Sequence, residues 1–89
     1  MSPERKIEAH LLKLARKHGW FCRKVRWIGR NGCPDRYLID PYYDRTWVEL
    51  KAPGKKPTKA QAAEHARMRS FGETVYVIDS IAGVERLFA

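Results

Sequence analysis

Apolar residues at helical spacing mark the start of the chain. Ile7, Leu11 and Leu14 recur on one face, as they do in a helix that buries a single stripe. Ser2 can cap this helix, with a proline in the first helical position, and Gly19 can end it. The pattern predicts a first helix between these two residues.

The segment that follows has the pattern of β-strands. Residues 20–28, WFCRKVRWI, are rich in aromatic and β-branched side chains and alternate in part. Residues 36–40, RYLID, and residues 46–51, TWVELK, are two shorter candidates joined by PYYDR. Because RNGCPD is turn-like, it separates the first candidate from the second. Three strands are predicted, the last two as a hairpin.

The remainder predicts a helix, a strand and a short helix. Thr58 and Gln61 have the spacing of a capping box and open a helix that a later glycine ends. Residues 74–79, TVYVID, are typical of a strand, and Ser80 can begin a closing helix. The order αβββαβα predicts an α/β fold, and we expect one domain over residues 1–89. The hydrophobic fraction of 44% supports a packed core and excludes a disordered chain.

Cationic charge is concentrated in the first third of the chain. The formal net charge is +8; residues 1–31 carry nine Lys and Arg against two Asp and Glu, and residues 32–89 carry nine against eight. Four cations interleave with apolar residues, as in a phosphate-contacting strand: Arg23, Lys24, Arg26 and Arg30. Three more lie in and after a Pro/Gly loop: Lys55, Lys56 and Lys59. We expect both groups to contact nucleic acid; the alternative is a solvated surface.

The cysteines and the hydropathy exclude several classes of protein. Cys22 and Cys33 have no second pair and no His at zinc-ligand spacing, so neither a disulfide framework nor a structural zinc site is indicated. There is no run of about 18 apolar residues, and the N-terminus lacks the apolar core of a signal peptide. We expect a cytoplasmic protein with no membrane partner.

Charged residues interrupt the predicted hairpin. Side chains alternate between the faces of a strand, so Glu49 and Lys51 share one face while Val48 and Leu50 take the other. Asp35 begins the preceding strand, and in an antiparallel pair the beginning of one strand lies beside the end of the next. Asp35 is therefore expected to approach Glu49 and Lys51.

The pairing of Asp35 with Glu49 indicates a divalent metal site. Two carboxylates in a partly buried site repel each other unless a cation lies between them. Oxygen ligands without His or thiolate suit Mg²⁺ or Mn²⁺, which would take a phosphate oxygen as a further ligand. Lys51 could then orient or deprotonate an activated water, or stabilise transition-state charge. The alternative is an exposed same-face pair of Glu49 and Lys51, with Asp35 capping a turn.

The sequence GCPD, followed by ELK with its Glu fourteen residues after the Asp, resembles the PD-(D/E)XK nuclease superfamily. The Gly-x-Pro-Asp form, the short hairpin and the small size are similar to the virus-type replication-repair nuclease (VRR-NUC) family, in its standalone phage and bacterial members. The resemblance covers nearly the whole chain. It implies a restriction-endonuclease-like core, αβββαβ, with a mixed sheet flanked by helices, in the cytoplasm of a bacterial or phage-infected cell.

The resemblance also implies roles for single residues. By this resemblance, Asp35 and Glu49 are metal ligands, and Leu50 is a ligand through its backbone carbonyl. Lys51 matches the catalytic base that acts on the attacking water. Glu8 matches an acid of the first helix that supports the metal or its waters.

Some of these residues have other interpretations. Glu8 could instead form a surface ion pair with Arg5. Gln61 matches a glutamine that the family places near the active site, but it fits the capping box with Thr58 equally well. His65 lies one turn later and could approach phosphate, although a lone helical His is more often structural.

The function implied by the resemblance is a Mg²⁺- or Mn²⁺-dependent endonuclease that hydrolyses DNA phosphodiester bonds. Nothing in the chain indicates base reading, so we expect selection by DNA shape. The resemblance further implies a homodimer that cuts branched DNA as Holliday junction resolvases do. Three aromatic residues could form the dimer interface: Tyr42, Tyr43 and Trp47. For Trp47, packing in the core is the alternative. Other possibilities are flap or nick cleavage, non-specific cleavage, and a basic nucleic-acid-binding module that does not cut.

Overall fold

Seven elements follow one another in the order that the sequence predicts. The computed structural model describes residues 1–89 and gives the order αβββαβα. The bounds are α1 (Pro3–Lys17), β1 (Phe21–Lys24), β2 (Arg36–Ile39), β3 (Arg45–Leu50), α2 (Lys59–Ser70), β4 (Val75–Ile78) and α3 (Ile81–Leu87). None of the three helices has the length and apolar character needed to cross a membrane.

The helices begin at the residues that the sequence marked as caps. The Ser2 side chain accepts a hydrogen bond from the backbone N–H of Arg5, and Ser80 accepts one from Gly83. Thr58 forms both bonds of a capping box. These bonds satisfy backbone N–H groups that have no partner inside a helix.

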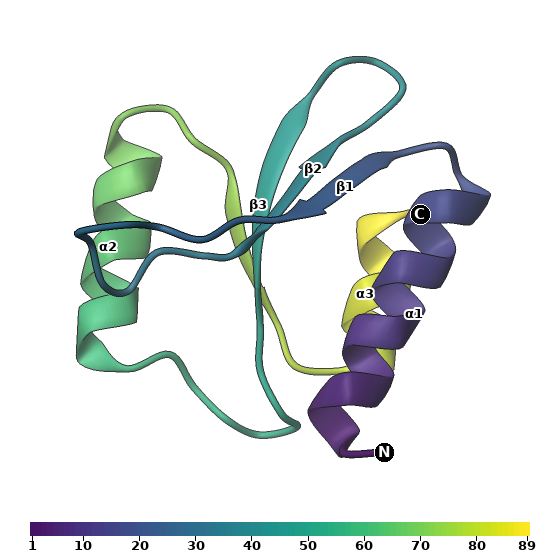
Figure 1. The fold of residues 1–89 in the computed structure, drawn as a ribbon, viewed down its shortest axis with the longest axis horizontal. Helices are drawn as coiled ribbons and strands as arrows, with labels where there is room; N and C mark the ends of the chain where they lie inside the picture. Colours follow the sequence, from purple (N-terminus) through teal and green to yellow (C-terminus); the bar gives the residue numbers. More distant parts are fainter.

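The four strands form one mixed sheet in the order β1-β2-β3-β4. The first three strands are antiparallel, and β4 runs parallel to β3. Helices α1 and α3 lie side by side on one face of the sheet, and α2 lies alone on the other face (Figure 1). The predicted α/β fold with a mixed sheet flanked by helices is confirmed.

The two faces of the sheet differ in what they bury. Under α1 and α3 lies the main core, whose seven buried residues come from five elements: Ile7, Leu11, Ala15, Leu38, Val48, Ile78 and Val84. Under α2 lies a smaller cluster of Trp47, Met68 and Val75. Because its apolar cluster is small, the position of α2 depends more on polar contacts with the sheet than the positions of α1 and α3 do.

Strand β3 is buried on both faces because it lies inside the sheet between the two helical layers. Val48 packs into the main core, while its neighbour Trp47 belongs to the cluster under α2. The expected alternation of this strand is therefore confirmed. Trp47 is only 9% exposed, so core packing accounts for it and the interpretation as an interface residue is wrong. Tyr42 and Tyr43, in the β2–β3 turn, are exposed.

Strand β1 is shorter than the sequence predicts. Its ladder with β2 ends at Lys24, although the Val25 N–H still donates to the Asp35 carbonyl at 2.7 Å. The chain then leaves the sheet, and the Trp27 ring lies 5.2 Å from the Trp47 ring. The aromatic residue that suggested a longer strand instead packs on the α2 side from a loop.

Candidate functional site

A cavity of about 190 Å³ lies where β3 ends, next to the segment just before β2 and the first turns of α1. It gathers side chains from four parts of the chain, and six of its residues were candidate site residues from the sequence. Its lining residues are Glu4, Arg5, Glu8, Lys24, Asp35, Glu49, Leu50 and Lys51. Distant segments thus meet at one small, highly charged hollow.

The pairing of β2 with β3 brings the two central carboxylates together. Arg36 is the partner of Val48, so one step further out Asp35 falls opposite Glu49. Residues opposite each other in an antiparallel pair share a face and lie close together. Asp35 itself precedes β2, and its carboxylate lies near enough to raise the pKa of Glu49. The expected approach across the hairpin is what the structure shows.

The loop that carries Asp35 is packed against the start of α2 (Figure 1). A Cβ atom on Gly32 would lie 2.8 Å from the carbonyl oxygen of Ala60, and the φ angle of Gly32 is +82°. The Trp27 indole N–H donates to the Pro34 carbonyl at 2.8 Å. These contacts explain the glycine of GCPD, because only a residue without a side chain lets this loop approach the helix.

Glu49 is a buried carboxylate that lacks a hydrogen-bond partner for one of its oxygens. Its residue is 9% exposed, and Oε1 has no partner. Burial raises the pKa of Glu49 to about 7; the Lys51 charge opposes this rise, and the charges of Asp35 and Glu4 add to it. A desolvated carboxylate in this state is stabilised in its ionised form by a nearby cation.

Lys51 and Gln61 form a hydrogen bond between β3 and α2. The Lys51 ammonium Nζ donates to Gln61 Oε1 at 2.7 Å. The same oxygen accepts the Thr58 N–H at 2.9 Å, and the Gln61 N–H donates to the Thr58 hydroxyl at 3.1 Å. The two interpretations of Gln61 are therefore compatible, since one side chain completes the capping box and contacts the site lysine.

Glu8 reaches the cavity from α1 and is paired with a cation that sequence reasoning missed. Arg36, rather than Arg5, donates to Glu8 Oε2, and Arg36 is 8% exposed. This hydrogen bond is the main reason that the pKa of Glu8 is lowered. A signal was present in the sequence: alternation puts Arg36 on the same face as the buried Leu38, and a cation on a core-facing position needs an acidic partner.

Comparison with known proteins identifies the family. No family model matches the sequence. The chain is 46% identical over 77 residues to "Putative nuclease p44" of Acyrthosiphon pisum secondary endosymbiont phage 1, covering 86% of this chain and 83% of that protein. A solved structure described as "VRR_NUC domain" superposes with a TM-score of 0.90 at 30% identity, over 99% of this chain and 96% of the other.

The chain belongs to the VRR-NUC nuclease family. The resemblance drawn from GCPD and ELK is thereby confirmed. In this VRR-NUC chain GCPD lies in the loop before β2, ELK lies at the end of β3, and the two motifs meet at the cavity, as the hairpin register requires.

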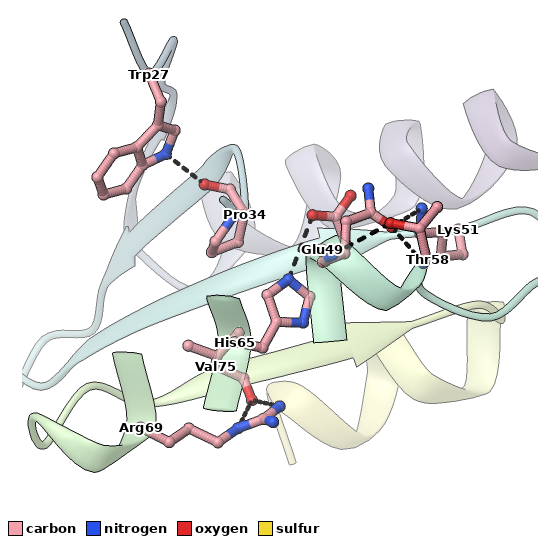
Figure 2. A network of polar contacts seen from close by, with 9 residues as sticks. Trp27, Pro34, Glu49, Lys51, Thr58, His65, Arg69 and Val75 are labelled. Atoms are coloured by element: carbon pink, nitrogen blue, oxygen red, sulfur yellow. Dashed lines mark hydrogen bonds and ion pairs between the residues drawn. The ribbon is translucent and has the colours of Figure 1, made fainter. Parts of the chain in front are cut away.

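His65 of this VRR-NUC protein, for which the sequence left open a phosphate contact or a structural role, is buried beside Glu49. It is 1% exposed on α2, and its Nε2 lies 3.6 Å from Glu49 Oε1 (Figure 2). The sequence offered one sign: His65 follows Gln61 by four residues, which puts both side chains on one helix face.

The predicted phosphate-contacting cations lie in different settings. Lys24 lines the cavity, and Arg23 and Arg26 are exposed beside it in the chain. The lysines of the second group, Lys55, Lys56 and Lys59, are exposed as well. Arg30 is the exception, because its guanidinium donates to Glu64 on α2 at 2.7 Å and ties the loop to that helix.

The donor set of the cavity fits a hard divalent cation. No group of three or more His, Cys, Asp or Glu side chains lies close enough to hold an ion by itself. Mg²⁺ sites commonly use only one or two carboxylates, with waters and phosphate oxygens completing the shell. Asp35, Glu49 and the backbone carbonyl of Leu50 could supply such a partial shell. Burial and the Asp35 charge raise the pKa of Glu49, and a cation held by both carboxylates would oppose that rise.

We predict that Gly32→Ala destabilises the protein more than Gly29→Ala. Both glycines have positive φ angles in the same loop, but a Cβ on Gly29 would meet nothing within 4 Å. Gly29→Ala should cost about 1 kcal/mol, the strain of a left-handed non-glycine residue. Gly32→Ala should cost about 3 kcal/mol, because the clash is with backbone that cannot rotate away. Urea denaturation measures the free energy of unfolding of both variants. Equal losses of stability would show that the contact with α2 does not contribute to stability.

Proposed function

We propose that this chain is a metal-dependent endonuclease that hydrolyses DNA phosphodiester bonds in the cavity between α1, β2 and β3. The observation that carries this proposal is the meeting of Asp35, Glu49 and Lys51 at one cavity, with the Glu49 carboxylate buried. When bound, a divalent ion would polarise a phosphate oxygen and lower the pKa of the attacking water. Asp35, Glu49 and the Leu50 carbonyl would hold that ion.

In this mechanism Lys51 handles the water or the developing charge. Its Nζ is held by Gln61 Oε1, which fixes the direction of the side chain without neutralising it by an ion pair. As an ammonium, Lys51 can orient the water or stabilise negative charge on the phosphoryl oxygens, and as a neutral amine it can accept the proton of the water. Gln61 is rigid in turn, because the same oxygen accepts the Thr58 N–H at the start of α2.

Glu8 is proposed to act from the opposite side of the cavity. The Arg36 guanidinium keeps the Glu8 carboxylate ionised and restricts its rotation. A carboxylate held in this way can accept hydrogen bonds from waters at the cavity mouth. Its support for a bound ion would be indirect, through those waters.

The DNA backbone is proposed to follow the exposed cations on either side of the cavity. Lys24 belongs to both the cavity and the basic strand β1, so phosphates bound along β1 would lead toward the site. Lys55, Lys56 and Lys59 follow Lys51 in the chain and could contact phosphates beyond it. The paired Arg30 would contribute less, because Glu64 already neutralises it.

Branched DNA, with a four-way junction as the favoured form, is the proposed substrate of a homodimer of this chain. The support is the family, the small binding surface of one 89-residue chain and the symmetry of paired incisions in a junction. A phage relative named as a nuclease is consistent with action in the cytoplasm of an infected or bacterial cell. The alternatives are flap, nick or non-specific cleavage, and binding without cleavage.

We expect Asp35→Asn and Glu49→Gln each to reduce cleavage of a labelled four-way junction by a factor of 1,000 or more, on the order of 4 kcal/mol of transition-state stabilisation. Binding of the junction should persist, because these changes remove negative charge that faces phosphate. Gel assays with Mg²⁺, and with EDTA in its place, measure both quantities. Glu73→Gln, an exposed carboxylate away from the cavity, is the matched control. Mg²⁺-independent cutting, or turnover that survives in both variants, would contradict the site assignment.

Affinity for DNA should fall steeply with salt because the basic strand releases counterions from phosphates. We expect the triple variant of Arg23, Lys24 and Arg26 to Gln to flatten the log–log salt slope by about 2 to 3, at about 0.9 per contact. The control changes Lys13, Arg16 and Lys17 to Gln, which removes the same charge from exposed positions on α1. An equal change of slope in both variants would mean that only the net charge matters.

The proposed homodimer should prefer a four-way junction to linear duplex at equal concentration. Sedimentation measures its mass, and competition cleavage measures the preference. If the exposed Tyr42 and Tyr43 lie in the dimer interface, changing both to Ser should shift the protein toward monomer. Phe71→Ser, which changes an exposed aromatic residue elsewhere, should leave the dimer intact. A monomer that cuts duplex as fast as junctions would rule out the resolvase proposal while leaving the nuclease site untouched.

A further inference from the structure

Two buried polar atoms without partners face each other between α2 and β3. His65 Nε2 and Glu49 Oε1 are 3.6 Å apart, and neither has a hydrogen-bond partner (Figure 2). Buried polar groups are normally hydrogen-bonded, because an unmet group in the interior costs free energy. The separation exceeds a hydrogen bond by about half an ångström. A small rotation of either side chain would close it.

The placement of His65 follows from a match between helix and strand spacing. Residues four apart on a helix are separated by about 6.0 Å along its axis, and residues two apart on a strand by about 6.7 Å. Gln61 and His65 therefore meet Lys51 and Glu49 in one register. The next turn of α2 continues this register along β3, since Met68 packs with Trp47 in the cluster under α2.

A histidine ring can donate a hydrogen bond from Nε2 in its neutral Nε2–H tautomer and in its charged form. A neutral imidazole can donate from only one nitrogen. The nitrogen that faces Glu49 is Nε2.

We propose that His65 is a positioning residue that donates a hydrogen bond from Nε2–H to Oε1 of Glu49 and fixes that carboxylate for metal binding. This inference rests on the proposed metal site and adds a residue to it. One Glu49 oxygen would then be held by α2, and the other would be free for the ion. Groups that orient a ligating carboxylate typically change metal affinity by about 10- to 100-fold when they are lost.

The test is the Mn²⁺ affinity of the protein without DNA, measured by calorimetry, for three variants and the wild type. His65→Leu removes both nitrogens at similar size, and we expect it to weaken Mn²⁺ binding by about 10-fold or more. His65→Gln can place an amide N–H near the position of Nε2, so we expect its affinity to stay within about threefold of the wild type. Thermal unfolding in EDTA shows whether each variant is folded. Glu49→Gln, the third variant, reports on the metal site itself.

The outcomes separate this inference from the proposed function. If Glu49→Gln weakens Mn²⁺ binding but His65→Leu binds like the wild type, the role of His65 is wrong and the metal site stands. If His65→Leu and His65→Gln are weakened equally, the hydrogen bond is also contradicted. If the wild type does not bind Mn²⁺, both proposals fail.

A second measurement uses the wild-type protein and does not depend on a variant that folds. Long-range ¹H–¹⁵N NMR distinguishes the two neutral imidazole tautomers. We expect the Nε2–H tautomer for His65, and a change in its ¹⁵N shifts in Glu49→Gln. The Nδ1–H tautomer in the wild type would overturn the proposal, because Nε2 would then have no proton to donate.

Discussion

The burial of Glu49 on the central strand is the constraint on which the rest of the structure depends. Strand β3 is covered on both faces, so a carboxylate there loses its water, and its pKa rises to about 7. A small protein has little stability with which to compensate such a cost. Nearby groups therefore have to stabilise the charge: Lys51 lies two residues away and His65 across the layer, and the proposed function adds a cation in the cavity.

Polar contacts, more than apolar burial, fix the position of α2. Only His65 and Met68 of this helix are buried. Arg69 donates to the Val75 carbonyl (Figure 2). Glu64 accepts a hydrogen bond from Arg30 in the loop before β2. Apolar surfaces are not directional, whereas hydrogen bonds define one register. The helix that faces the site is thus set at the position that brings Gln61 to the site lysine.

Features that depend on local order could be read from the sequence, and features that depend on distant pairs could not. The caps at Ser2 and Thr58, the alternation in β3 and the approach of Asp35 to Glu49 all follow from neighbours or from one short hairpin. The early end of β1 could not be seen, because it depends on packing between Trp27 and a residue twenty positions away. The pairs of Arg36 with Glu8 and His65 with Glu49 likewise join separate elements, and their residues look ordinary in isolation.

The carboxylates of this fold differ in how they are partnered. Glu8 is paired with Arg36, and Glu64 with Arg30, so each of these acids has a protein cation beside it. Glu49 is more buried than Glu8, yet no arginine pairs with it, and His65 Nε2 lies 3.6 Å from its Oε1. Glu49 instead shares the cavity with the carboxylate of Asp35, whose charge raises the pKa of Glu49 further. Two carboxylates so placed are stabilised by a cation between them, and the pairing of charges in this fold leaves that cation to come from outside the chain.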